Sequence, residues 1–181
     1  IIVNTPNNPT GRVLSRSELE IIAEFAEAND LWILSDEVYS ELVFGDARHL
    51  SIASLSDETA ARTVTLNSVS KTYAMTGWRI GYCLAPAELA PVLARINHLT
   101  TRCAASFIQH ASVTAYRECA SHVEVMRREY TRRRDAMIAG FQRIEGIECT
   151  PPDGTFYAFP NFPEAWGGSR ALADHLLETQ G

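Results

Sequence analysis

The strongest constraint on the fold is a series of short apolar segments separated by a helical pattern. Ile1–Val3 and Leu31–Leu34 contain no polar residue, which is typical of strands that are covered on both faces of a sheet. Between them, apolar residues recur every three or four positions over Leu19–Ala26, and Ser15 with Glu18 forms the pattern of a helix-capping box. Strand, helix and strand in this order predict a parallel α/β sheet.

Further elements follow along the chain, and most of them are predicted to be helical. They are strands at residues 62–66 and 80–84, helices within 86–116 with an irregular joint near Thr100, a long helix over 121–145, strand-like pieces over 155–159, and a helix from Ser169 to about Thr179.

Charge and cysteine content exclude several classes of protein. The formal net charge is -6, whereas binding to nucleic acid or to an anionic membrane surface favours a basic chain. No apolar run approaches the roughly 18 residues of a membrane-spanning helix. The four cysteines are far apart and form no CxxC pair, so we expect reduced thiols in a cytoplasmic protein. The five histidines are scattered, and no metal site is predicted.

Lys71 is the only lysine among 16 basic residues. Arginine can replace lysine as a surface cation, but its guanidinium stays protonated and cannot form an imine. One lysine in an arginine-rich chain is therefore consistent with amine chemistry at Lys71, and also with chance.

Polar residues follow three of the predicted strands. They are Asn7 and Asn8 after the first, Asp36 and Tyr39 after the second, and Ser68 to Lys71 after the third. Ligands in open α/β sheets bind beyond the carboxyl ends of the strands, so we expect these groups to converge on one edge of the sheet.

Taken separately, these residues have simpler interpretations. Asp36 follows four apolar residues and an intervening serine, where it can be either a helix N-cap or the partner of a buried cation such as a protonated pyridine nitrogen. The serine-rich turn around Lys71, followed by Arg79, can bind any anion.

Four segments of the sequence match the motifs of one enzyme family. Asn4–Gly11 is similar to an Asn-Pro-Thr-Gly loop, and Ser35–Tyr39 looks like an Asp-x-x-Tyr motif. Ser68–Gly81 resembles a Ser-x-Ser-Lys segment followed by Gly-Trp-Arg, and Pro152–Tyr157 resembles the first strand of a small domain. In order and spacing the chain resembles the class I/II aminotransferases, pyridoxal 5′-phosphate (PLP) enzymes of fold type I.

The resemblance implies a role for each matching residue. Lys71 would carry PLP as an internal aldimine and move the proton during catalysis. Asp36 would pair with the pyridinium nitrogen, and Asn8 and Tyr39 would hydrogen-bond the cofactor's O3′. The phosphate would be held by Ser68, Ser70 and Arg79.

The resemblance also implies a division of the chain. Residues 1–124 would form the carboxyl-terminal part of the parallel-sheet large domain, and residues 125–181 the linking helix and the start of an α+β small domain. A ring-stacking aromatic residue and an arginine for the substrate carboxylate would lie outside this segment. Because the family forms homodimers that share their sites, the isolated segment is expected to be inactive.

The implied reaction moves an amino group between an amino acid and a 2-oxo acid by a ping-pong mechanism. Three alternatives remain: a carbon–sulfur lyase or a cyclopropane-forming synthase on the same scaffold, a sensor domain of a transcription regulator, and a noncatalytic homologue. The same Lys71, Asp36 and Arg79 would serve the aminotransferase, the lyase and the synthase alike, so these motifs do not separate these enzymes or determine the amino-acid specificity.

One basic cluster has a structural interpretation. Five arginines lie between residues 127 and 134, and Glu124 and Glu129 precede two of them by four positions. This spacing predicts ion pairs along a solvent-facing side of the long helix.

Overall fold

The sheet positions everything else in the molecule. The computed structural model describes residues 1–180 and contains a four-stranded sheet in the order β1-β2-β3-β4. β1 (Ile2–Asn4), β2 (Ile33–Asp36) and β3 (Thr63–Ser68) are parallel, as predicted. β4 (Gly81–Leu84) runs antiparallel to β3, contrary to the expectation of a wholly parallel sheet.

The direction of β4 follows from the connection before it. Residues 69–80 fold into α3 (Val69–Thr72) and a short 3-10 turn (Thr76–Trp78). Both remain at the end where β3 finishes, so that Gly81 pairs directly with Ser68. A parallel strand would need a crossover to the other end of the sheet, usually a long helix.

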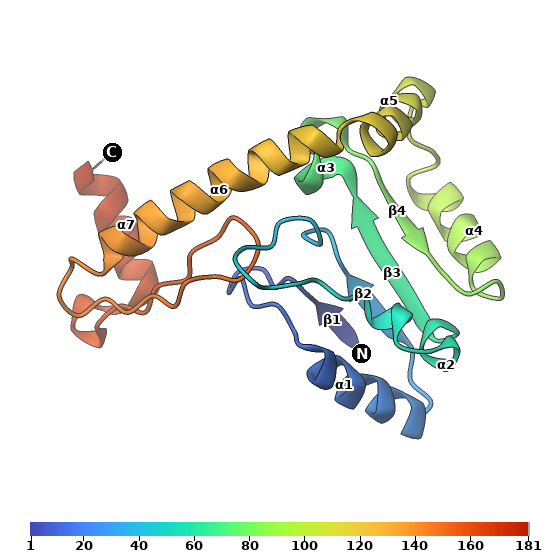
Figure 1. Ribbon diagram of the computed structural model, residues 1–181, viewed down its shortest axis with the longest axis horizontal. Helices are drawn as coiled ribbons and strands as arrows, with labels where there is room; N and C mark the ends of the chain where they lie inside the picture. The colour runs from blue at the N-terminus through green and yellow to red at the C-terminus, as the bar shows by residue number, and fades with distance from the viewer. Residues whose placement is uncertain (181) are drawn as a thin grey trace.

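The predicted helix after Ser15 is α1 (Arg16–Ala28), and its capping box is present. Ser15 accepts from the Glu18 backbone, and Glu18 accepts from the Ser15 N–H at 2.8 Å. One side of α1 is buried against the sheet. The core formed there contains Val3, Leu19, Ala23, Ala26, Ile33 and Ile52. Figure 1 shows α1 and the short α2 (Asp57–Ala60) beside the sheet, on the side away from α6.

The second half of the chain is mainly helical, as predicted. Its helices are α4 (Ala90–Thr100), α5 (Ser106–Glu118), α6 (Ala120–Phe141) and α7 (Gly168–Gln180). The irregular joint lies between α4 and α5, and the long helix ends at Phe141 instead of residue 145. In Figure 1, α6 extends from the sheet region to α7.

The predicted strand-like pieces at residues 155–159 do not form a strand. Two isolated bridges flank them, Val43 with Gly154 and Glu148 with Asn161. Thr155 has a left-handed backbone conformation, with φ of 67°, which breaks the extended geometry that a strand requires.

The loop after β2 and the segment after α6 lie side by side (Figure 1). Backbone hydrogen bonds join them, from Phe44 N–H to the Asp153 carbonyl and from Thr155 N–H to the Leu42 carbonyl, each at 2.8 Å. The predicted domain boundary at residue 125 falls inside the continuous helix α6, and the division into two domains stays a prediction. Gly181 lies outside the described residues. Within residues 1–180, no helix is long and apolar enough to cross a membrane.

Candidate functional site

The loops after β1, β2 and β3 meet at one edge of the sheet. Asn4 pairs with Asp36 in the sheet register, and Asp36 pairs with Leu66. Beyond this row, the Asn4 side-chain amide and the Thr5 N–H both donate to the Asp36 carbonyl, at 3.2 and 3.3 Å. The parallel register therefore brings the three predicted polar loops to the same edge.

Asp36 is half-buried, and one of its carboxylate oxygens accepts from the Val38 N–H at 3.3 Å. β2 is followed by turns at residues 38–41 and not by a helix. The helix N-cap interpretation of Asp36 is therefore wrong. Its carboxylate closes a local turn and keeps further acceptor capacity, since an ionised carboxylate can accept about four hydrogen bonds.

Lys71 lies in α3 with its ammonium among aromatic rings. Its Nζ is 5.7 Å from the centre of the Tyr39 ring and 5.2 Å from the centre of the Phe156 ring, within the range of cation–π attraction. Those two rings are themselves packed edge to face, with centres 5.4 Å apart. Among residues 1–180, Lys71 forms no ion pair, so its amine is not committed to a carboxylate.

Tyr39 is buried, with 2% of its surface exposed. Its hydroxyl donates to the Tyr157 hydroxyl at 3.0 Å. Burial raises the pKa of Tyr39, and the hydrogen bond to Tyr157 and the nearby Asp36 carboxylate raise it further. The Tyr39 phenol therefore remains protonated at neutral pH and is a hydrogen-bond donor beside Lys71.

The candidate phosphate ligands are arranged around the start of α3. Ser68 is the N-cap of α3, and its hydroxyl accepts from the Ser70 N–H at 3.1 Å. Arg79 lies two residues before Gly81, the sheet partner of Ser68. Its guanidinium is exposed and donates to the Thr76 carbonyl at 2.9 Å. Within the described part of the chain, no hydrogen bond joins this guanidinium to Ser68 or Ser70.

Arg79 also has an unusual backbone. Its φ is 53° and its ψ is 50°, the left-handed region that residues other than glycine rarely adopt. Such conformations persist where the surroundings demand them, often at functional sites.

Asn8 lies in the loop that reaches this edge, but its side chain is exposed. Its backbone N–H donates to the Asn4 side-chain oxygen at 2.8 Å, and Asn7 donates to the same oxygen at 3.4 Å. The loop is therefore placed as predicted, while the Asn8 amide has no partner recorded within residues 1–180.

The sequence analysis did not predict that two aromatic residues, Phe156 and Tyr157, belong to the site. Phe156 and Tyr157 were assigned only to the start of a small domain, yet both rings contact Tyr39. Tyr130 of α6 stacks on Phe156, with ring centres 5.7 Å apart. A chain separation of 118 residues between Tyr39 and Tyr157 leaves no local pattern that could have revealed this contact.

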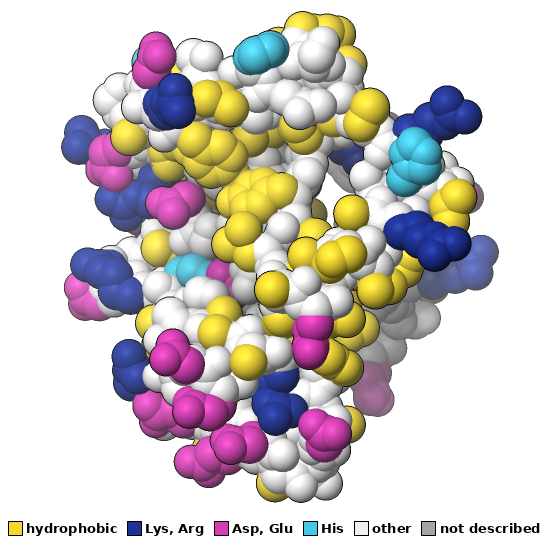
Figure 2. Space-filling view, turned by 90° about the vertical axis from the view of Figure 1, so that its right-hand side faces the viewer, with side chains coloured by type: hydrophobic (Ala, Val, Ile, Leu, Met, Phe, Trp, Pro, Cys, Tyr) yellow, Lys and Arg dark blue, Asp and Glu magenta, His cyan; other side chains and the backbone are white. Residues whose placement is uncertain are grey.

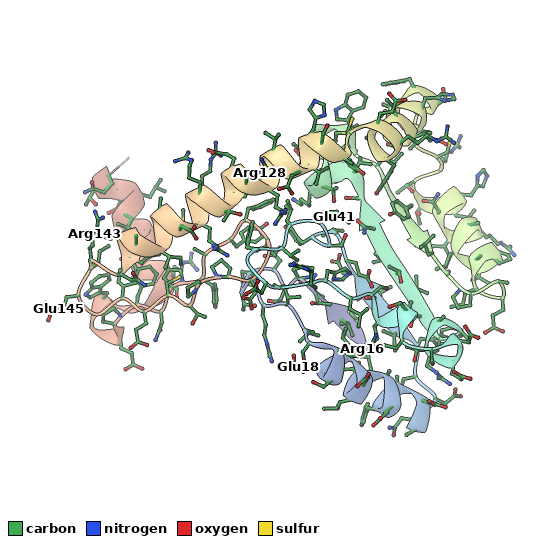
Figure 3. The ribbon with its side chains drawn as sticks, viewed as in Figure 1. Arg16, Glu18, Glu41, Arg128, Arg143 and Glu145 are labelled. Atoms are coloured by element: carbon green, nitrogen blue, oxygen red, sulfur yellow. The ribbon has the colours of Figure 1, made fainter. Side chains whose placement is uncertain are left out.

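The arginines of α6 divide into two groups. Arg128 and Arg133 pair with Glu124 and Glu129, as predicted, and Figure 3 shows Arg128 on the middle of α6. Arg134 pairs with Asp135 at 2.7 Å, but it also lies 5.1 Å from the centre of the Phe44 ring and donates to the Pro152 carbonyl at 3.4 Å. The solvent-facing interpretation is therefore wrong for Arg134, which packs against the loops beside the site.

Comparison with known proteins gives a consistent result. A model of the family described as aminotransferase class I and II matches residues 1–181. The probable aspartate/prephenate aminotransferase of Aquifex aeolicus is 42% identical over 183 residues, which cover 98% of this chain and 46% of that protein. Aromatic-amino-acid aminotransferase 2 of Thermococcus litoralis is 42% identical over 180 residues, with the same two coverages of 98% and 46%.

A solved structure agrees with these relatives. The aromatic aminotransferase from Pyrococcus horikoshii OT3 superposes with a TM-score of 0.91 at 39% identity, over 98% of this chain and 48% of that one. The chain thus spans about half the length of the relatives it matches, and its mostly parallel sheet with flanking helices is part of the fold-type I architecture. Sequence and structure together place this chain in the class I and II aminotransferase family.

Proposed function

We propose that this chain forms part of a PLP-dependent aminotransferase, which transfers an amino group between an amino acid and a 2-oxo acid. The observation that carries the proposal is the position of Lys71. The single lysine of the chain lies at the edge where the β1, β2 and β3 loops meet, with its amine between the Tyr39 and Phe156 rings.

The donors at this edge fit PLP. Asp36 offers a half-buried carboxylate with free acceptor capacity for a protonated ring nitrogen. Tyr39 and Asn8 offer hydrogen-bond donors for the ring oxygen, and Lys71 offers the amine for the aldehyde. Two hydroxyls and a guanidinium, from Ser68, Ser70 and Arg79, suit a phosphate.

PLP, when bound, supplies an electron sink that stabilises negative charge at the α-carbon of an amino acid. The protein's own residues would control this chemistry. The Asp36 carboxylate would keep the ring nitrogen protonated, because an adjacent anion favours the charged form. The Lys71 amine would accept and return the proton at the substrate α-carbon. Tyr39, held protonated by its raised pKa, would remain a donor throughout.

The names of the relatives favour amino transfer over the other reactions. The matches from A. aeolicus and T. litoralis are both named aminotransferases, which supports this reading over a lyase, a synthase or a sensor domain. Because a relative named for aspartate and prephenate and one named for aromatic amino acids are both 42% identical to this chain, the amino-acid specificity is left open.

We also propose that the whole protein is a cytoplasmic homodimer. All four cysteines are free thiols, which fits a reducing compartment. A partner subunit would complete the site, as expected from the family resemblance.

The site assignment is tested by borohydride reduction of the PLP-loaded full-length protein, followed by peptide mapping. We expect a phosphopyridoxyl group on Lys71, and its loss in Lys71→Arg, which keeps the charge but cannot form an imine. Arg95→Lys in α4 is a matched control that adds a second lysine, and it should stay unlabelled. Label on a lysine elsewhere in the protein would refute the assignment.

The reaction type is tested with a ¹⁵N-labelled amino acid and an unlabelled 2-oxo acid. An aminotransferase should move the label into the new amino acid and release no ammonia. Release of labelled ammonia together with a 2-oxo acid would instead establish a lyase.

A further inference from the structure

Tyr157 is the one residue that hydrogen-bonds the Tyr39 side chain, among the described residues. The two hydroxyl oxygens are 3.0 Å apart and the ring centres 5.9 Å apart. Tyr39 belongs to the loop after β2, whereas Tyr157 belongs to the segment after α6. Neither the sequence motifs nor the family match assigns a role to Tyr157.

The segment that carries Tyr157 is held tightly against the site loops. We call Asp153–Tyr157 the 153–157 segment. The Gly154 N–H donates to the Gly11 carbonyl, and the Thr155 N–H donates to the Leu42 carbonyl, both at 2.8 Å. Gly154 has no room for a side chain, because a Cβ there would lie 2.8 Å from Pro6 Cβ and 3.0 Å from the Leu42 carbonyl oxygen.

Thr155 adds a strained backbone to this segment. It is fully buried, and its φ is 67°, a genuine outlier for a β-branched residue. Its hydroxyl accepts from the Tyr157 N–H at 3.2 Å. Such a conformation persists only where the surrounding contacts impose it, and here it directs the next two side chains toward Tyr39 and Lys71.

We propose that Tyr157 is a positioning residue for the Lys71 site, which fixes the Tyr39 hydroxyl, and that the 153–157 segment holds Tyr157 in place for this purpose. The inference rests on the proposed function, because it concerns how Tyr39 acts on the cofactor. Tyr157 itself acts through Tyr39 and is not a catalytic residue.

The chemistry of two paired phenols supports this role. Each hydroxyl can donate one hydrogen bond and accept others. When the Tyr39 hydrogen is given to an acceptor beside Lys71, Tyr157 can reverse its role and donate to the Tyr39 oxygen. That bond fixes the torsion of the Tyr39 hydroxyl and strengthens it as a donor. The charged groups around Tyr39 are the Asp36 carboxylate and the Lys71 ammonium. An ionised carboxylate has no hydrogen to donate, and among the described residues Lys71 forms no hydrogen bond with the Tyr39 oxygen.

The test is a pH titration of the visible absorbance of the PLP-loaded full-length protein, in wild type, Tyr157→Phe, Tyr39→Phe and the double variant. We expect Tyr157→Phe to shift the midpoint pH of the absorbance change in the same direction as Tyr39→Phe does, but by a smaller amount. The expected shift is about 0.3–1 pH unit, which corresponds to the loss of one net hydrogen bond. If Tyr157 acts through Tyr39, the double variant should match Tyr39→Phe.

The chain offers a matched control. Tyr116 donates to Tyr82 at 3.2 Å in a second tyrosine pair, so Tyr82→Phe removes the same kind of contact outside the site and should leave the midpoint unchanged. Phenylalanine at position 157 keeps the ring packing against Phe156 and Tyr39. Thermal unfolding curves define a temperature at which every variant is folded for the titration.

Two results would overturn the inference. An unshifted midpoint in Tyr157→Phe would exclude a positioning role, and an additional shift in the double variant would show that Tyr157 acts independently of Tyr39. Borohydride labelling of each variant separates these failures from failure of the proposed function. Label on Lys71 with an unshifted midpoint rejects the role of Tyr157 alone, whereas absence of label in the wild type rejects both.

Discussion

At the residue scale, the pKa values of two buried side chains near the site, Tyr39 and Glu37, depend on their neighbours. Tyr39 is kept protonated by burial and by Tyr157. Glu37, the next residue after Asp36, is the opposite case. It is 4% exposed, and its carboxylate accepts from Ser35 at 2.8 Å and Ser51 at 2.7 Å and contacts His49 Nε2 at 3.0 Å. Burial alone would raise the pKa of Glu37, but these three partners together lower it.

This lowered pKa makes the stability of the fold depend on pH. A carboxyl whose pKa is lower in the folded state stabilises the protein above its unfolded pKa, and this contribution is lost as the pH falls through the folded value. We therefore expect Glu37→Gln to destabilise the full-length protein by about 1–3 kcal/mol at pH 7, and by progressively less below about pH 4.5.

Urea unfolding of wild type and Glu37→Gln at pH 7 and pH 3.5 measures this difference. Glu24→Gln, at an exposed position of α1, is the control and should change little at either pH. A difference between wild type and Glu37→Gln that stays constant between the two pH values would contradict the assignment of the network.

At the element scale, the connections between strands decide where the site residues lie more than the strands themselves do. The turn formed by α3 and the 3-10 helix reverses the chain, so that β4 is antiparallel and Arg79 remains near the end of β3. Figure 3 places Glu41 in the loop after β2, near the end of β3 that leads into α3. Glu41 contributes to the raised pKa of Tyr73, although burial is the larger cause. Glu41 of the loop after β2 therefore acts electrostatically on Tyr73 of the segment after β3.

Two glycine-to-alanine substitutions test how tightly the 153–157 segment packs against the site loops. Gly154→Ala should destabilise the protein by roughly 1–3 kcal/mol, as overpacking does, because the new methyl group would meet Pro6 Cβ and the Leu42 carbonyl. Gly140→Ala in α6 should stabilise it by up to about 1 kcal/mol, since alanine is the better helix former and no atom lies within 4 Å of the new Cβ.

Denaturant midpoints of the two alanine variants provide the comparison. Gly154→Ala should also shift the visible titration midpoint in the direction of Tyr157→Phe, because it displaces Tyr157, whereas Gly140→Ala should not. Equal stability of the two variants would mean that the 153–157 segment is free to move away from the loops.

At the scale of the whole molecule, several large apolar side chains are exposed to solvent. Ile2 is 75%, Leu84 63% and Leu99 74% exposed. Figure 2 shows hydrophobic side chains gathered over the upper and middle parts of one face, with acidic side chains near its lower end. A groove of about 750 Å³ lies between β4 and α4, and another of about 730 Å³ lies beside β1. Monomeric proteins rarely expose contiguous apolar patches of this kind.

We therefore expect residues 1–181 expressed alone to bind a hydrophobic dye and to lack aminotransferase activity, whereas the full-length protein binds little dye and is active as a dimer. Dye fluorescence, light scattering after size exclusion and the ¹⁵N transfer assay measure these three properties. An active monomer formed by residues 1–181 would contradict both the expected dimer and the expected dependence on the rest of the protein.

The sequence by itself determined most of the helices and strands and the placement of the principal loops. Continuous apolar strands, the capping box at Ser15 and the periodicity of α6 are local patterns, in which a residue's neighbours in the chain decide its conformation. Because the carboxyl ends of parallel strands must meet, these patterns also predicted that the Asn8, Asp36 and Lys71 loops share one edge. The roles of the individual ligands remain predictions.

Only the tertiary structure decided the direction of β4, the turn at Asp36, the buried Glu37–His49 pair and the contact between Tyr39 and Tyr157. Each of these depends on atoms that are distant in the sequence or on a backbone conformation that the side-chain pattern does not encode. The left-handed Thr155 is the clearest example, since its own β-branched side chain disfavours φ of 67°. Backbone hydrogen bonds from Gly154 to Gly11 and from Thr155 to Leu42 hold this segment in place, and they bring the Phe156 ring from the segment after α6 to the lysine.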